Sequence, residues 1–233
     1  MNATPTTVRA SWPAKSRQAA AACGILGPIL LAIYFGAPAV SGWPYAGASP
    51  DELVRFADAH AWLFYAGAWL QVTGTLLSIV FYIALLSAGR AQETFWGYVL
   101  LIAAGSVLTL VVVEAAFLVA VPVAAAGGDK ATVATGFALS NGIFARVFPL
   151  APASASYVAL GAVVLRSAVL PRSFGQAAIA LGVAFEAAGL AAVLTNVAVF
   201  AAVALSVLQT LWILAAALAF AFGPDTQRVS ASN

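Results

Sequence analysis

Long apolar runs separated by short polar segments dominate the hydrophobic pattern of this chain. Six runs are long enough to cross, as α-helices, a hydrocarbon layer about 30 Å thick. The pattern therefore predicts an all-α polytopic membrane helical bundle with six transmembrane helices, which together form one domain over residues 19–222. The predicted spans are residues 19–40, 61–86, 95–121, 149–165, 174–195 and 199–222.

Two segments between the spans carry helical signals of their own. Residues 131–148 are fairly apolar, contain Asn141 and Arg146, and end before a proline, so they are predicted to form an interfacial or re-entrant helix. In the first loop, Ser49 and Glu52 have the spacing of a capping box, and Pro50 suits a first helical turn. This loop is expected to be either a short amphipathic surface helix or a simple connector.

The distribution of basic residues predicts that both termini are cytoplasmic. With the N-terminus inside, seven Lys and Arg side chains lie on the inner side and three on the outer side. Residues 1–18 and 223–233 are then cytoplasmic tails, and the alanine-rich composition favours a multi-pass protein of the bacterial inner membrane. The inner residues are Arg9, Lys15, Arg17, Arg90, Arg166, Arg172 and Arg228; the outer ones are Arg55, Lys130 and Arg146.

Composition narrows the possible partners and cofactors. The chain is 63% hydrophobic and 8% charged, and its mean hydropathy is +0.99, so the lipid bilayer is its main surrounding. The net charge of +2 comes from dispersed basic residues, which argues against nucleic acid. A single cysteine, Cys23, a single histidine, His60, and the lack of nucleotide or hydrolase motifs lead us to expect no cofactor and no metal. The sequence defines no oligomeric state.

Two carboxylates interrupt the predicted spans, Glu114 within VVVEAAF and Glu186 within AFEAAGL. A charge in hydrocarbon costs several kcal/mol unless it is paired or neutralised, so each is a candidate proton donor in its neutral form. The alternative is a protonated side chain that only binds a neighbouring helix. Counting along the helices places Glu114 in the outer half and Glu186 near the middle, so they could share one cavity.

Aromatic and polar residues toward the same side are the candidates for binding a substrate. Ring faces stabilise a cation in a dry pocket, although most of these aromatics also suit a membrane-interface belt. Arg146 pairs with a glutamate or extends to the headgroups. The candidates are Trp62, Tyr65, Trp69, Gln71, Phe117, Asn141, Arg146, Tyr157, Phe185 and Asn196.

The glutamates of VVVEAAF and AFEAAGL, set in alanine-rich spans, resemble those of the small integral-membrane terpene cyclases of bacteria and fungi. The resemblance implies a compact helical bundle that cyclises a hydrophobic, prenylated substrate. Glu114 or Glu186 would be the general acid, and aromatic side chains would stabilise the carbocations. Fungal members have seven spans, whereas six are predicted here.

Two other functions remain open. In a proton-coupled transporter of a small solute, the glutamates relay protons while Asn141, Arg146 and Asn196 line a path. A carrier needs polar residues through the full membrane depth, and the inner half of these spans is nearly devoid of them. A non-catalytic membrane subunit, in which the glutamates only support packing, explains the missing motifs.

Overall fold

A computed structural model describes residues 14–44, 47–167, 169–194 and 198–222, and every regular element in these ranges is helical. The first thirteen residues and the predicted tail 223–233 lie outside the described residues. The long helices are α1 (Ala14–Ser41), α3 (Ala61–Ala88), α4 (Phe95–Ala126), α7 (Arg172–Leu194) and α8 (Ala198–Phe222), and the shorter ones are α2 (Pro50–Ala59), α5 (Lys130–Gly142) and α6 (Ser154–Ser167).

Six helical stretches of the described chain are long and apolar enough to cross a membrane, which confirms the predicted membrane helical bundle. Several helices extend beyond the predicted spans. Helix α1 begins at Ala14, where polar residues that favour helix precede the apolar run, and α4 continues to Ala126 through valine and alanine.

The predicted separate helix at 131–148 is wrong, because that segment is part of the fourth span. Helix α5 continues through two π-helical segments, η1 (Ile143–Val147) and η2 (Pro149–Ala153), directly into α6. The whole stretch, Lys130–Ser167, is 38 residues long. Proline cannot make the i→i−4 bond of an α-helix, but local π turns provide other partners for the released backbone groups. The chain therefore stays helical through Pro149 and Pro152.

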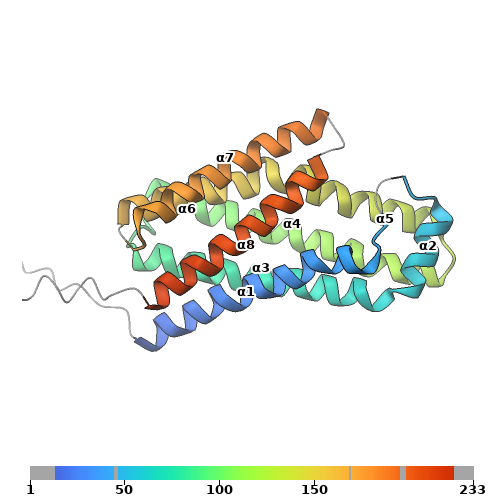
Figure 1. The fold of residues 1–233 in the computed structure, drawn as a ribbon, viewed down its shortest axis with the longest axis horizontal. Helices are drawn as coiled ribbons and strands as arrows, with labels where there is room; N and C mark the ends of the chain where they lie inside the picture. Colours follow the sequence, from blue (N-terminus) through green and yellow to red (C-terminus); the bar gives the residue numbers. More distant parts are fainter. Residues whose placement is uncertain (1–13, 45–46, 168, 195–197, 223–233) are drawn as a thin grey trace, which may run out of the picture.

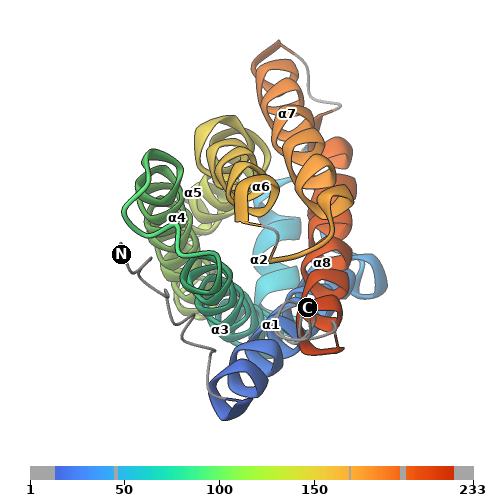
Figure 2. The same cartoon turned by 90° about the vertical axis from the view of Figure 1, so that its left-hand side faces the viewer.

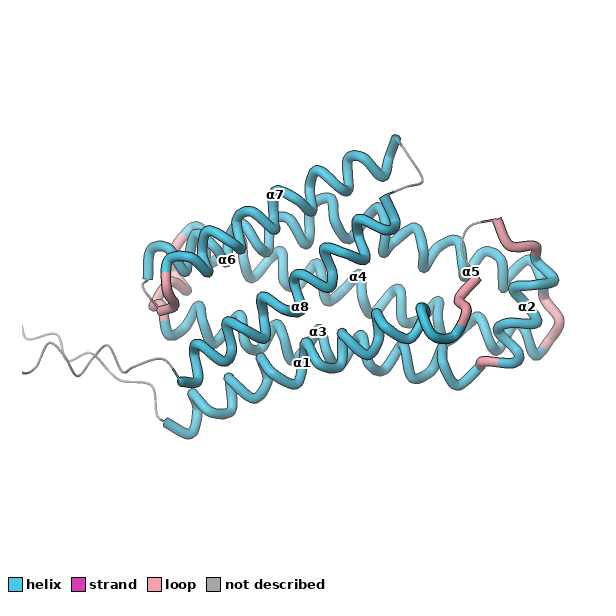
Figure 3. Tube along the Cα trace, in the orientation of Figure 1, coloured by secondary structure: helices cyan, strands magenta, loops and turns pink. Residues whose placement is uncertain are grey.

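The bundle forms by lateral packing of these spans (Figure 1). Helix α1 contacts α3 and α8, α4 contacts α3, α5 and α6, and α7 contacts α6 and α8. Seen along its length, the bundle has α3, α6 and α8 facing a common interior (Figure 2). Helix α1 begins and α8 ends at the same end of the bundle, as an even number of spans requires, and most connecting loops lie at the two ends (Figure 3).

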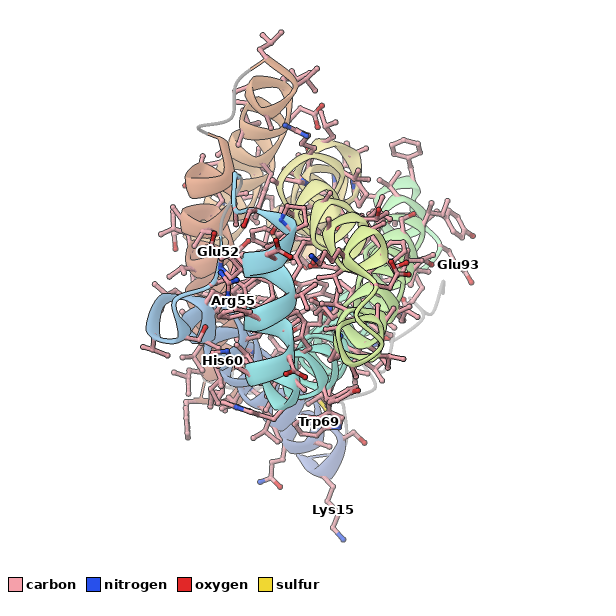
Figure 4. All side chains as sticks on the ribbon, turned by 90° about the vertical axis from the view of Figure 1, so that its right-hand side faces the viewer. Lys15, Glu52, Arg55, His60, Trp69 and Glu93 are labelled. Atoms are coloured by element: carbon pink, nitrogen blue, oxygen red, sulfur yellow. The ribbon has the colours of Figure 1, made fainter. Side chains whose placement is uncertain are left out.

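Helix α2 lies across the opposite end, called here the α2 end (Figure 4). The N–H of Glu52 donates to Ser49 Oγ over 3.3 Å and Pro50 begins the helix, so of the two alternatives for this loop the capped helix is the one present. Its buried residues Leu53 and Ala57 join the apolar cluster that α4 and α5 form at this end. The first loop is therefore a docked helix.

Two acidic residues organise the start of α5. Asp51 on α2 forms an ion pair with Lys130, and this pair lowers the pKa of the Asp51 carboxyl. Asp129 caps α5 by accepting the N–H of Thr132 over 3.1 Å, and the hydrogen bonds from Thr132 lower the pKa of Asp129. The ion pair joins α2 to the fourth span.

A glycine crossing brings α1 and α3 together. A Cβ atom added at Gly74 would lie 2.9 Å from the Gly27 carbonyl oxygen and 2.9 Å from Leu31 Cγ. A Cβ atom added at Gly27 would lie 2.6 Å from Ser78 Oγ. Small residues permit such backbone approach between helices in lipid. The crossing positions Leu31 and Ser78, which both line the cavity described next.

Candidate functional site

A partly open cavity of about 60 Å³ lies among α1, α3, α4, α6, α8 and the π-helical segments. Its lining combines apolar side chains with polar and aromatic ones, although it lies within the predicted membrane spans. Polar groups at this depth are costly and are usually associated with function. The polar and aromatic residues of the lining are Tyr34, Phe35, Gln71, Thr75, Ser78, Tyr82, Glu114, Phe144, Phe148, Ser156, Tyr157 and Gln209.

Glu114 is the carboxylate of this cavity, and its side chain is 5% exposed. The Tyr34 hydroxyl donates to Glu114 Oε1 over 3.2 Å, and the Ser140 hydroxyl donates to the same oxygen over 3.1 Å. Among the described residues, no Lys, Arg or His is paired with this carboxylate. A buried carboxylate without a cation needs either a proton or a positively charged ligand.

Gln71 is the second polar group of the cavity that stands out. Its side chain is 2% exposed, and its Nε2 has no hydrogen-bond partner among the described residues. An unmet buried donor costs about 1–3 kcal/mol, so such groups are normally satisfied by protein, water or ligand. The amide and Glu114 both line the same space, which makes the cavity suited to a polar occupant.

A polar stripe runs from Gln71 along α3. Thr75, Ser78 and Tyr82 follow at intervals of four, three and four residues, so all four side chains lie on one face of the helix. All of them line the cavity. The stripe covers about 16 Å at 1.5 Å per residue. The inner half of the spans is thus richer in polar groups than the sequence analysis allowed.

Aromatic side chains close the cavity at the Tyr82 end of the stripe. The hydroxyls of Tyr82 and Tyr157 are 2.9 Å apart and buried. The Tyr157 ring stacks on Phe185 with centroids 5.9 Å apart and meets Trp212 edge-on at 5.7 Å. Phe148 contacts Phe185 from the other side at 5.7 Å. These rings form an aromatic wall of the cavity.

Three of the predicted site residues line the cavity, Glu114, Gln71 and Tyr157, and Phe185 packs directly behind Tyr157. Phe117 and Asn141 are half-buried but do not belong to the lining. Asn196 lies outside the described residues.

The other aromatic candidates face away from the cavity. Trp62, Tyr65 and Trp69 are 66%, 45% and 60% exposed on the outer face of α3, where they suit an interface belt. Trp69 lies at the edge of the bundle in Figure 4. Arg146 is also exposed, and its Nε donates to the Ala192 carbonyl over 3.3 Å.

Glu186 is not part of this cavity. It is half-buried on α7 and is not among the lining residues, so the two glutamates do not share the space. Its neighbour Phe185 takes the inward position on that helix. The predicted acid role of Glu186 stays a prediction.

Several residues of the site, lining the cavity or bonded to Glu114, were missed by the sequence analysis. Tyr34 and Phe35 come from the first span and Gln209 from the last, each within a mainly apolar stretch. Ser140 was missed because the segment that carries it was interpreted as an interfacial or re-entrant helix. The spacing of the α3 stripe and the isolated glutamine in VLQTLW were the available signals.

Comparison with protein-family models, curated proteins and solved structures finds no match for this chain. The resemblance to membrane terpene cyclases therefore extends only to the layout of six apolar helices. A buried glutamate and a cluster of aromatic rings are the site features present.

Proposed function

We propose that the protein is a proton-coupled carrier of a small solute, in which Glu114 binds a proton and the solute in alternation. The observation that carries this proposal is the burial of Glu114 beside a mainly apolar cavity, with no cation of the described chain paired to it. Exchanging a proton for a cationic solute keeps the site neutral in both states. The large cost of an unpaired charge in the membrane is thereby avoided.

The size and lining of the cavity support a small solute. A cavity of about 150 Å³ accommodates benzene and drug-sized ligands occupy about 300–1,000 Å³. The volume of about 60 Å³ is therefore far below what a prenyl chain needs. Gln71 Nε2 is a buried donor of a residue in the lining and has no partner among the described residues, and a hydrocarbon substrate would leave it unmet.

The π-helical segments support a moving element beside the site. Phe144, Phe148 and Ala153 belong to or adjoin these segments and line the cavity. Ser140, which bonds to Glu114, lies just before them. Short π-helical stretches often occur at functional sites. Bending at η1 and η2 would change access to Glu114.

The charge distribution supports an orientation for this carrier. The excess of Lys and Arg at the end where α1 begins supports cytoplasmic termini, and a bacterial inner membrane remains our proposed location. The α2 end would then face outward.

A terpene cyclase is the second candidate, and the aromatic wall of Tyr82, Tyr157 and Phe148 is the observation that favours it. Ring faces beside a buried acid suit a carbocation. This function requires the cavity to enlarge severalfold around a prenyl chain. Incubating membranes that contain the protein with linear prenyl substrates tests it, and an isomeric product lost in Glu114→Gln would establish it.

Transport by reconstituted vesicles tests the proposed carrier. Labelled small amines, amino acids and polyols are supplied, and uptake is compared with and without an imposed proton gradient of either direction. We expect gradient-driven accumulation of one class, lost in Glu114→Gln and retained in the matched variant Glu186→Gln. Absence of gradient-driven uptake across the panel, or equal uptake by Glu114→Gln, would contradict the proposal.

A further inference from the structure

We infer that the solute is a small primary ammonium that also carries a hydroxyl group, with ethanolammonium as the model compound. This inference rests on the proposed function, because it assigns the solute of the same cavity. Three features carry it: the Glu114 carboxylate that no cation of the described residues pairs with, the Gln71 Nε2 that has no hydrogen-bond partner there, and the volume of the cavity.

The carboxylate selects a positive charge. Both described hydroxyl donors bond to Oε1 of Glu114, so Oε2 is the oxygen left for a ligand. An ammonium N–H bonds to such an oxygen with charge assistance, whereas a neutral solute leaves the buried charge uncompensated.

Aromatic rings next to the carboxylate also favour a cation. The Tyr34 ring lies 5.2 Å from that of Phe35, which in turn lies 5.7 Å from that of Phe144. All three line the cavity, and Tyr34 itself bonds to Glu114. Ring faces attract a cation within about 6 Å of the centroid. A protonated amine is thus stabilised by both charge and rings.

The amide of Gln71 requires more than a cation. An ammonium offers only donors, so it cannot satisfy the unpartnered Nε2 of Gln71. The solute therefore needs a second group that accepts a hydrogen bond. A hydroxyl fits best because it both accepts and donates, and so satisfies the amide in either of its two flip orientations.

The volume sets the length of the solute. Scaled from benzene, whose six non-hydrogen atoms occupy a cavity of about 150 Å³, the space of about 60 Å³ holds roughly two to three non-hydrogen atoms. An ammonium and a hydroxyl joined by a two-carbon chain have one atom more than this, so they are the smallest such pair and require a slight expansion of the lining. Bulkier cations such as quaternary trimethylammonium compounds exceed this volume much further.

Three isosteric compounds separate these contributions: ethanolammonium, propylammonium and 1-propanol. Binding to the purified full-length protein in lipid nanodiscs is measured by calorimetry at constant ionic strength. We expect propylammonium to bind about fivefold more weakly than ethanolammonium, because it leaves the Gln71 donor unmet. For 1-propanol, which lacks the charge, we expect affinity about a hundredfold lower.

Variants assign each contribution to its residue. Gln71→Met should bind ethanolammonium and propylammonium equally, and Gln71→Leu serves as a second test of the same point. Glu114→Gln should lose about a hundredfold in affinity for both amines. Thr73→Ala, on the same helix but outside the lining, is the matched control and should behave as the wild type.

The inference is overturned if none of the three compounds binds, if 1-propanol binds as well as the amines, or if both Gln71 variants retain the preference for ethanolammonium. Vesicle transport separates this failure from that of the proposed function. Gradient-driven, Glu114-dependent uptake of a solute other than an amine would leave the carrier proposal standing. If the amines bind as predicted but no uptake follows the proton gradient, the proposed ligand stands and the proposed carrier function is contradicted.

Discussion

The hydroxyl of Tyr34 on α1 donates to Glu114 Oε1 on α4 over 3.2 Å, across 80 positions of the sequence. Ser140 on α5 bonds to the same oxygen, so three helices meet at one buried carboxylate. Such a junction holds the side chain at the edge of the cavity in one orientation. Protonation of Glu114, or its binding of a ligand, therefore changes a contact of the first span and a contact of the fourth span together.

Removing the Tyr34 hydroxyl tests this junction. We expect Tyr34→Phe to lower the free energy of unfolding by about 1 kcal/mol, because a buried hydrogen bond to the carboxylate is lost. Solute affinity should fall as well. Tyr65→Phe changes a tyrosine that is 45% exposed and should have no effect on either quantity. Thermal unfolding in detergent measures the stability, and an equal loss in both variants would count against a specific role for Tyr34.

The paired hydroxyls of Tyr82 and Tyr157 should show strong coupling. Either single change to Phe leaves one buried hydroxyl unpaired and should cost about 1–3 kcal/mol. The double variant should cost less than the sum, because it removes both polar groups together. A double-mutant cycle of unfolding free energies measures this, and strict additivity would show that the 2.9 Å contact contributes nothing.

The α1–α3 crossing should not tolerate an added methyl group. Gly74→Ala places a Cβ 2.9 Å from a backbone oxygen, and we expect a loss of about 1–3 kcal/mol in unfolding free energy. Gly105→Ala is the matched control, because its Cβ meets no atom within 4 Å and alanine favours helix. Thermal unfolding compares the two. Similar stability of both variants would refute the close crossing.

The Asp51–Lys130 pair predicts a pH-dependent attachment of α2. Because the folded protein lowers the pKa of Asp51, its contribution is present above the ordinary pKa of aspartate and is lost as the pH falls through the lowered value. Asp51→Asn should therefore speed hydrogen exchange in α2 modestly at neutral pH and low salt, and not in strong acid. Asp58→Asn, exposed on the same helix, should exchange like the wild type at every pH.

The six spans were predictable from the sequence because hydropathy over about 20 residues is a sufficient signal for a membrane helix. The cap at Ser49 was also predictable, since its partner Glu52 is three residues away. The continuous helix through Pro149 and Pro152 was not. Local proline chemistry indicates a break, and the π turns that avoid it depend on neighbouring helices.

The site was predictable only where a residue was unusual in its own span. Glu114 and Gln71 stood out as polar residues in apolar sequence, and both line the cavity. Tyr34 and Ser140 contact Glu114 because their helices are rotated about their axes so that these side chains face it. Alanine-rich spans with apolar residues on every face do not specify this rotation. For the same reason, the sequence allowed a cavity shared by Glu114 and Glu186, whereas only Glu114 lines it.

Infrared spectroscopy of the protonated-carboxyl band tests most directly the central claim that Glu114 exchanges a proton. Membranes that contain wild type, Glu114→Gln or Glu186→Gln are compared as the suspension is taken from about pH 6, where exposed carboxyls are ionised, to alkaline pH. We expect a band that disappears in alkali in the wild type and in Glu186→Gln, and that is missing in Glu114→Gln. A band unchanged by Glu114→Gln, or one that alkali never removes, would contradict this claim.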